Sequence, residues 1–557
     1  MRILFTPILC SLLAFILFFA GLGAVGFLGP DEPRYAGVAR EMLRSGDYVT
    51  PRLFGSAWLE KPPLYYWLAA LGFRLGVSET TARLPSAVFA CLFLALWFWF
   101  ARRRFGHRVA TLGCILLAST VGWIGFSRAA AMDMLFSSTL CAALVFLALW
   151  FWENKPLQLY GFCALLGVAT LAKGPLAVAL AGLVTLGYVA TFGEWRQLQR
   201  LLWTPALLVY FGVAAPWYLL CFQQNGYGFI EEFFLRHNWE RFTSAAIGHP
   251  QPFWFYVPVL AAGIFPWTPL LLLPLLEIIR KGLRSILANR QTAFLFYWVA
   301  LPFVFFSISR NKLPGYLLPL LPPLTLWIAH IVERNWPGQA AEPAEGKLSG
   351  NPRKDSLTEQ LILWLVGLSS LLLLAIPVLC LLLPGSLAEG LRQALAASSP
   401  AHLWVEIWEG SIPFPVWLML VGLIPVSFYL LRRRQLLAAF FVVLLGVGLG
   451  TATIVEYLSP AINRAASVRT VAQRLRSRGI RGADLATYRI HRNQSFGLSF
   501  YMDRELPEWS PDEETAAASF VIARQEELLP EGRSLILFPG PRLRLWALPE
   551  TPRRESR

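Results

Sequence analysis

Long runs without a charged residue dominate this sequence. Thirteen stretches of at least 17 residues contain no Asp, Glu, Lys or Arg, and a helix needs about 20 apolar residues to cross a bilayer. They cover residues 3–30, 84–101, 109–127, 134–152, 156–172, 174–193, 201–230, 242–276, 291–309, 313–332, 360–388, 410–431 and 435–455. Strands of a membrane β-barrel would alternate in polarity instead. The pattern therefore predicts an all-α polytopic membrane protein with about 13 transmembrane helices.

The composition excludes several other classes. Of the 557 residues, 56% are hydrophobic and only 15% are charged, which excludes a soluble globular protein of this size and a disordered chain. All seven cysteines fall within apolar runs and form no CxxC pair. They indicate neither a disulfide framework nor a zinc motif.

The net charge is +15, and the basic residues are distributed along the chain as in a membrane protein. If the N-terminus is cytoplasmic, most of the basic clusters fall in cytoplasmic loops, for example residues 102–108, 280–290 and 432–434. This is the positive-inside pattern, so we expect no nucleic-acid partner. Thirteen crossings would then place the C-terminus on the side of the membrane away from the cytoplasm, together with the loops after the first and seventh spans.

The chain divides into four expected regions. They are a catalytic transmembrane module with periplasmic loops (1–333), a cytoplasmic linker (334–357), three C-terminal transmembrane helices (358–456) and a small soluble α/β periplasmic domain (457–557). Within the first outer loop, residues 32–43 have helical character. Within the last region we expect a helix at 465–478 and strands at 519–523, 534–538 and 543–548.

The first candidate motif, GPDEPRY at residues 29–35, follows the first apolar run. Asp31 and Glu32 are either functional acids or helix caps, because acidic residues at a helix start satisfy free amides and complement the dipole. A second motif, WLEKPPLYYW at residues 58–67, contains Glu60 and Lys61. Taken alone, its aromatic residues indicate an interfacial anchor.

Further ionisable residues lie in or between the later apolar runs. Asp133 lies in an outer loop and Lys173 separates two spans. Charged side chains within a membrane usually face a cavity or a partner. Asp133 and Lys173 could therefore belong to a functional site, or they could form a structural ion pair with each other. The loop after the seventh span supplies His237 and Arg241; a lone loop histidine is more often solvated than a metal ligand.

The loop between the ninth and tenth spans reads SRNKLPGY at residues 309–316. Its cations, Arg310 and Lys312, either serve a site or extend to lipid headgroups. All these motifs are predicted on the outer face, where cations could stabilise a departing phosphate and a carboxylate could orient or deprotonate an acceptor. The sequence has no Walker loop or dinucleotide fingerprint, so we expect a lipid-linked donor.

In this order, the motifs resemble those of the GT-C membrane glycosyltransferases, in the family that includes protein O-mannosyltransferases. Within it they are similar to the transferases that add 4-amino-4-deoxy-L-arabinose to bacterial lipid A. The resemblance covers the first ten apolar runs. It rests on DEPRY (31–35), its continuation REMLRSGD (40–47), EKP (60–62), Asp133, KG (173–174), RF (241–242), PFWFYVP (252–258), PW (266–267) and KLPGY (312–316).

The resemblance implies roles for individual residues. Asp31 would be the key catalytic acid, supported by Glu32, Asp133 and Lys173. The substrate-binding residues, which would hold the lipid phosphate and the sugar, are expected to be Arg34, Tyr35, Lys61, Arg241, Lys312 and Tyr316. No cofactor is required by the sequence, although members of the family can bind zinc at the positions of Glu60 and His237.

The resemblance also implies the substrates. We expect an undecaprenyl-phosphate-linked sugar as donor, lipid A as acceptor and membrane lipids as surroundings, with resistance to polymyxin and other cationic peptides as the outcome. Transfer to protein or glycan hydroxyls is the alternative within the family. A lipid or sugar transporter is the alternative from another class, although its site would be expected near the bilayer midplane rather than on one face.

Overall fold

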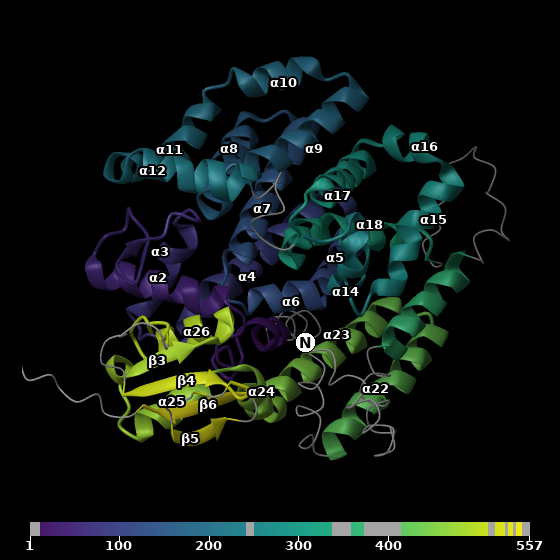
Figure 1. The fold of residues 1–557 in the computed structure, drawn as a ribbon. Helices are drawn as coiled ribbons and strands as arrows, with labels where there is room; N and C mark the ends of the chain where they lie inside the picture. Colours follow the sequence, from purple (N-terminus) through teal and green to yellow (C-terminus); the bar gives the residue numbers. More distant parts are fainter. Residues whose placement is uncertain are drawn as a thin grey trace, which may run out of the picture.

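The computed structural model describes residues 12–240, 250–336, 358–372, 414–510, 519–527, 529, 533–538 and 542–548. Within these ranges the chain is a helical bundle with one small sheet near its C-terminal end. The sheet domain, in yellow, lies at one end of the bundle beside the N-terminal helices, in purple (Figure 1). Most of the expected linker, and parts of the apolar runs 3–30 and 360–388, fall outside the described residues.

The larger part of the bundle is formed by helices between residues 31 and 334. They are α2 (Asp31–Ser45), α3 (Leu64–Phe73), α4 (Glu79–Phe105), α5 (His107–Ala118), α6 (Val121–Ser127), α7 (Met132–Glu153), α8 (Pro156–Lys173), α9 (Leu176–Phe192), α10 (Trp195–Leu202), α11 (Ala206–Asn225), α12 (Tyr227–Phe229), η1 (Ile230–Glu240), η2 (Phe253–Phe255), α14 (Tyr256–Gly263), η3 (Thr268–Leu271), α15 (Leu272–Lys281), α16 (Leu283–Ala288), α17 (Arg290–Ile308), η4 (Pro314–Leu320) and α18 (Leu321–Arg334).

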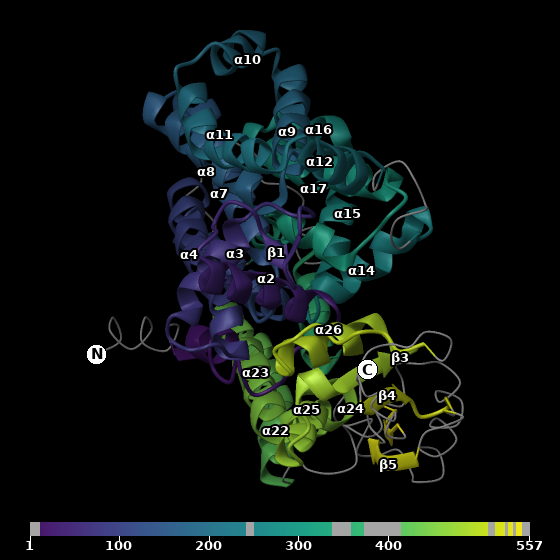
Figure 2. The same ribbon diagram turned by 60° about the vertical axis from the view of Figure 1, so that its left-hand side comes forward.

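The C-terminal part contains a helix at Thr358–Leu372 and the elements that follow residue 413. These are α22 (Phe414–Arg432), α23 (Leu436–Thr453), η5 (Ile454–Leu458), α24 (Ser459–Ala466), α25 (Arg469–Ser477), η6 (Gly482–Asp484), β3 (Leu485–Tyr488), α26 (Arg492–Tyr501), β4 (Phe520–Arg524), β5 (Arg533–Phe538) and β6 (Leu543–Ala547). In both ribbon views α22 and α23 lie side by side, away from α10 (Figures 1 and 2).

Helix α7 is the centre of the bundle. It is apolar on all sides and buried along almost its whole length, as expected for a helix surrounded by others. Its neighbours include α4, α8 and η4. Because Asp133 lies in its first turn, the packing of α7 fixes the position of this carboxylate.

Seven helices in the described ranges are long and apolar enough to cross a membrane, or eight if the pair α5 and α6 counts as one span. This confirms a polytopic helical membrane protein. Several expected spans are shorter or broken: the run at 109–127 becomes α5 and α6, which are bent by 64°. The break falls at Thr120, whose hydroxyl accepts a hydrogen bond from the Trp123 amide at 3.2 Å and so starts a new helix.

The first outer loop folds as expected and adds a short hairpin. The predicted helix at 32–43 is confirmed as α2, which is followed by β1 (Arg52–Leu53) and β2 (Ser56–Ala57), an antiparallel pair. Helix α3 then returns the chain to the bundle and packs against α2 and α4. The loop therefore supports α2 from one side.

The C-terminal sheet has the strand order β3-β4-β6-β5, in which β3 and β4 are parallel and the other pairs antiparallel. The three predicted strands are confirmed as β4, β5 and β6. The helix predicted at 465–478 is confirmed as α25, but it begins later, at Arg469. Ser467, whose hydroxyl accepts a hydrogen bond from the Arg469 amide at 3.2 Å, separates it from α24.

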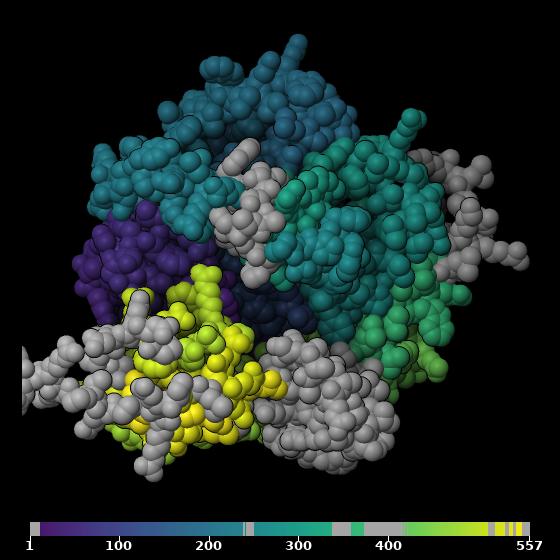
Figure 3. Space-filling model, viewed as in Figure 1, coloured from purple at the N-terminus to yellow at the C-terminus, as the bar shows by residue number. Residues whose placement is uncertain are grey.

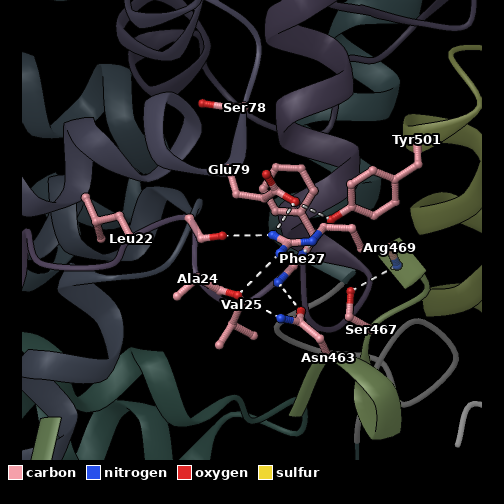
Figure 4. A network of polar contacts seen from close by, with 12 residues as sticks. Leu22, Ala24, Val25, Phe27, Ser78, Glu79, Asn463, Ser467, Arg469 and Tyr501 are labelled. Carbon is pink, nitrogen blue, oxygen red and sulfur yellow. Dashed lines mark hydrogen bonds and ion pairs between the residues drawn. The ribbon is translucent and has the colours of Figure 1, made fainter. Parts of the chain in front are cut away.

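The C-terminal domain holds the segment at residues 22–28, which leads into α2 (Figure 4). The side chain of Asn463 accepts a hydrogen bond from the Gly26 amide and donates one to the Ala24 carbonyl, both at 2.7 Å. The Tyr501 hydroxyl accepts from the Phe27 amide at 2.9 Å. These bonds satisfy backbone groups that have no partner in a helix or sheet.

The two sides of this contact fit closely. A Cβ on Gly26 would lie 2.3 Å from the Ser467 hydroxyl oxygen, so only glycine allows this approach. Tyr501 donates its hydroxyl proton to Glu79 at 2.8 Å, and Arg469 lies 3.3 Å from the same carboxylate. In the space-filling view the C-terminal domain lies directly against the N-terminal helices (Figure 3).

Candidate active site

Helix α2 begins at Asp31, and its first turn meets the EKP motif. The side chain of Asp31 is 47% exposed, whereas that of Arg34 is only 6% exposed, and Arg34 donates a hydrogen bond to the Asp31 carboxylate. Glu60 lies 3.6 Å from Arg34 and 3.5 Å from Lys61. Two acids and two bases therefore meet here, and Asp31 is the acid with the greatest access to a ligand.

Aromatic rings surround the Arg34 guanidinium. Its central carbon lies 5.6 Å from the ring centre of Tyr35, 5.3 Å from that of Trp58 and 5.4 Å from that of Phe496. Cation–π contacts at this range hold a guanidinium in place. Phe496 belongs to α26, so the C-terminal domain contributes directly to the surroundings of Arg34.

Tyr35 lies in a buried aromatic cluster. It is 5% exposed, and its ring centre lies 6.1 Å from that of Tyr65 and 6.0 Å from that of Tyr66. This packing favours a supporting role for Tyr35 over the substrate contact expected from the sequence.

Glu32 is held by four hydrogen bonds. Arg83 donates two, at 2.8 and 2.7 Å, and the amides of Leu28 and Ala130 donate one each at 2.8 Å. A buried carboxylate with all these partners is a structural anchor. The geometry therefore favours a supporting role over the catalytic role expected for Glu32, because Glu32 joins α2 to α4 and to the turn before Asp133.

The second acidic centre is an ion pair between Asp133 and Lys173. The Lys173 amine donates to the Asp133 carboxylate at 2.6 Å and lies 4.8 Å from the ring centre of Tyr316 and 5.4 Å from that of Phe136. Three segments far apart in the sequence meet here: the start of α7, the end of α8 and η4. The ion pair that the sequence suggested as one of two possibilities is therefore present, and the ring of Tyr316 packs against its lysine.

Lys312 makes hydrogen bonds to backbone carbonyls and not to the residues of the two acidic centres. Its amine donates to the backbone carbonyls of Gln251, at 3.0 Å, and Ser309, so two of its three protons are used to join two outer loops. It also lines a largely apolar pocket of about 530 Å³ between α14 and α17 with Phe253, Trp254, Val257, Phe303 and Arg310. These contacts favour a loop-anchoring role over direct phosphate binding.

His237 lies in η1 and contacts Glu232, whose carboxylate is 2.9 Å from Nε2. Burial lowers the pKa of His237, while nearby Glu60 opposes this shift. Zinc sites in proteins use three or four protein ligands, but the described residues contain no group of three that could hold a metal. Because Glu60 also faces Arg34 and Lys61, this donor set does not fit a zinc ion.

Some parts of the site were not visible from the sequence. Arg83, the partner of Glu32, is one buried arginine at the start of a long apolar run, and Phe496 belongs to a helix that the sequence did not predict. Arg241 lies outside the described residues, so its expected role stays a prediction.

Comparisons with known proteins find similar sequences and similar folds. Residues 60–219 match the dolichyl-phosphate-mannose-protein mannosyltransferase family. Two curated relatives carry the name undecaprenyl phosphate-alpha-4-amino-4-deoxy-L-arabinose arabinosyl transferase. The one from Pseudomonas paraeruginosa strain PA7 is 35% identical over 336 residues, or 58% of this chain and 59% of that protein. The one from Edwardsiella ictaluri is 32% identical and covers 55% of each.

The match spans somewhat more than half the length of these curated relatives. Solved structures extend the likeness to almost the whole chain. ArnT from Cupriavidus metallidurans bound to undecaprenyl phosphate is 24% identical, with 97% of each chain covered and a TM-score of 0.71. The apo structure covers 98% of each chain with a TM-score of 0.72. The resemblance stated from the motifs is thus confirmed, and the chain is a multi-pass membrane protein with the fold of ArnT.

Proposed function

We propose that this chain is a membrane glycosyltransferase that moves 4-amino-4-deoxy-L-arabinose from undecaprenyl phosphate to a phosphate group of lipid A. The names of its relatives and the fold of ArnT support the substrates. The observation that carries the proposal is the half-exposed Asp31 carboxylate beside the buried cation Arg34, with the partly buried Lys61 next to Glu60, the second acid of the cluster. Such cations stabilise the negative charge of a departing lipid phosphate.

The proposed reaction exchanges one bond at the anomeric carbon. An oxygen of the acceptor phosphate forms a bond to this carbon, and undecaprenyl phosphate leaves with the electrons of the broken carbon–oxygen bond. The second pKa of a phosphate monoester is about 6, so the attacking oxygen is already ionised near neutral pH. Asp31 is therefore assigned to orienting the sugar and stabilising the positive charge that develops on its ring.

The other site residues divide into two groups in this proposal. Lys61, with Arg241 as an expected partner, binds the donor phosphate, while Asp133, Lys173 and Tyr316 form a second group that supports the site. The apolar pocket beside Lys312 is suited to an aliphatic chain. The proposal routes no step through a metal, and among the described residues Glu60 and His237 belong to no group of three potential ligands.

The proposal includes the finer topology expected from the sequence. We place the N-terminus in the cytoplasm and the active site in the periplasm, with thirteen crossings and region boundaries after residues 333, 357 and 456. The positive-inside distribution of charge supports this orientation. An added amino group lowers the net negative charge of lipid A, which would weaken the attraction of polymyxin and other cationic peptides.

One alternative has a specific observation in its favour. The family match at residues 60–219 is to protein mannosyltransferases, which would place the acceptor among protein or glycan hydroxyls. A hydroxyl would need a base, and Asp31 could serve. The identity of the acceptor separates the two reactions.

Replacing Gly315 with alanine is expected to lower kcat for transfer about 10- to 100-fold. A Cβ at this position would lie 2.7 Å from the Asp133 carboxylate and 2.9 Å from the Phe126 ring, and small displacements of reacting groups cost this much. Gly212→Ala is the matched control, because nothing lies within 4 Å of its added Cβ. Equal activities of the two variants in membranes would contradict the role of Asp133.

The proposed function is tested by mass spectrometry of lipid A from cells that lack this protein. We expect a phosphate-linked aminopentose after complementation with the wild type and none after complementation with Asp31→Asn at equal protein level. If the donor is made and lipid A stays unmodified with the wild type, the lipid A proposal is wrong, and protein or glycan acceptors would be examined next.

A further inference from the structure

A polar pocket of about 370 Å³ lies between α2 and the C-terminal domain. Its walls come from the second half of α2, from the turn before α4 and from α25 and α26. In both ribbon views α26 runs beside α2 (Figures 1 and 2). The pocket is separate from the residues assigned above to the sugar donor.

Arginines dominate the charge of this pocket. Arg40, Arg44, Arg469 and Arg476 line it, against two acids, Glu79 and Asp503. The described residues of the pocket therefore carry two more positive than negative charges. Guanidinium groups bind phosphate oxygens in pairs of parallel hydrogen bonds, so the excess favours a phosphate ligand.

Two of these arginines converge on one carboxylate. Arg44 donates two hydrogen bonds to Asp503, both at 2.8 Å, and Arg40 lies 2.9 Å from it. The hydrogen bond from Arg44 lowers the pKa of Asp503, and the charges of Arg40 and Arg476 lower it further. Asp503 therefore holds Arg40 and Arg44 together, and its single negative charge offsets only one of their two positive charges.

The remaining two arginines are held in place by the C-terminal domain. Arg476 donates to the backbone carbonyl of Tyr501, and Arg469 lies 3.3 Å from Glu79 (Figure 4). The side chain of Arg44 is 58% exposed, so the pocket is open to a ligand. The cations are thus positioned in advance of binding.

Helix α26 connects the pocket to the active site. Its residue Phe496 packs on Arg34, and Phe500, one turn later, lies 4.4 Å from the Arg40 guanidinium carbon. Along α2, Asp31 and Arg40 are about 14 Å apart at a rise of 1.5 Å per residue. A sugar headgroup that carries phosphates at two positions would be long enough to contact both Asp31 and the arginines around Arg40.

We propose that this arginine pocket, formed by Arg40, Arg44, Arg469 and Arg476, binds a second phosphate group of the acceptor while the first receives the sugar at Asp31. This inference rests on the proposed function and adds a role for the C-terminal domain, which supplies two of the four arginines. The ligand class is a phosphorylated glycolipid headgroup.

The test compares two acceptors in a purified transfer assay. Arg44→Gln and Arg476→Gln are expected to raise KM for bis-phosphorylated lipid A about 10-fold or more, the effect of one charge-assisted hydrogen bond. KM for the mono-phosphorylated lipid, KM for the donor and kcat should not change. Arg44→Lys should recover part of the effect, because the charge remains.

Arg474→Gln is the matched control, since Arg474 is exposed on the same helix α25 but does not line the pocket. An unchanged KM for the bis-phosphorylated lipid in both pocket variants would overturn the proposal. An equal rise in KM for both lipids would also overturn it, because that result indicates a structural effect.

A binding measurement separates failure of this inference from failure of the proposed function. Detergent-solubilised wild-type protein should bind bis-phosphorylated lipid A without donor about 10-fold more tightly than Arg44→Gln, and inorganic phosphate should compete. If the wild type transfers no sugar to either lipid, the proposed function is wrong. The pocket is then supported only if this difference in binding remains, and it is rejected if the two proteins bind equally.

Discussion

Replacing Asp31 with asparagine is expected to lower kcat for sugar transfer about 100-fold or more while leaving the protein folded. The substitution keeps the size of the side chain and removes its charge, and losing one group that stabilises developing charge costs about 10²- to 10³-fold in comparable reactions. Arg34, the buried partner of Asp31, still has the Glu60 carboxylate at 3.6 Å, so its charge keeps a counter-charge in the variant and the protein is expected to stay folded. Initial rates with purified protein, donor and lipid A would measure the effect.

Glu41→Gln is the control for this substitution. Glu41 lies on the same helix and accepts a hydrogen bond from the Gly55 amide at 2.8 Å, which a glutamine oxygen can also accept. We expect the rate of this variant to stay within about twofold of the wild type, since surface substitutions of this kind have small effects. Wild-type activity in Asp31→Asn would remove Asp31 from the mechanism.

Replacing Arg83 with leucine is expected to cost about 3–5 kcal/mol of stability, because it leaves Glu32 charged in a buried site. Arg83 also donates to the carbonyls of Leu22, at 2.7 Å, and Val25, at 2.6 Å. Its loss would therefore release the segment that the C-terminal domain holds. Thermal unfolding in detergent, followed by circular dichroism or by loss of the monodisperse peak, would detect the change.

Arg102→Leu is the matched control, an exposed arginine at the other end of α4. It should shift stability by no more than about 0.5 kcal/mol. If Arg83→Leu unfolds at the same temperature as the control, Glu32 does not depend on this ion pair, and its assignment as a structural anchor is wrong.

The membrane architecture was predictable because it depends on local composition. The tendency of each apolar run to enter a bilayer depends only on its own residues. Helix α2 could also be predicted locally, because it has acidic residues in its first turn and an arginine near its end. The exact spans were less predictable. A break such as that between α5 and α6 depends on one hydroxyl, that of Thr120, inside an otherwise uniform run.

The C-terminal domain shows a different limit. Its three antiparallel strands follow simple apolar patterns, whereas β3 and α26 did not stand out because their character depends on tertiary contacts. Residues of α26 face both the sheet and α2: Leu498 belongs to the core of the domain, while Phe496 reaches Arg34. A helix that packs against two different surfaces shows no single apolar face, so its sequence has no clear helical periodicity of apolar residues.

The residues of the candidate site could be identified from the sequence, but the role of each one could be predicted only in part. Asp133 and Lys173 were identified as ionisable groups at membrane depth, and their pairing follows from the cost of leaving either one alone. The role of Glu32 depends on Arg83, 51 residues away along the chain, and that of Lys312 on two backbone carbonyls. Partners of this kind cannot be assigned before the fold is known.

The most direct test of the proposed function is transfer by the purified protein in liposomes that contain undecaprenyl-phosphate aminoarabinose and lipid A, with no ion gradient. We predict lipid A with a phosphate-linked aminopentose and an equal amount of free undecaprenyl phosphate. If donor is consumed only when a peptide or glycan is added, the acceptor assignment is wrong. If no donor is consumed and lipid only moves between leaflets, the protein is a transporter and the central claim fails.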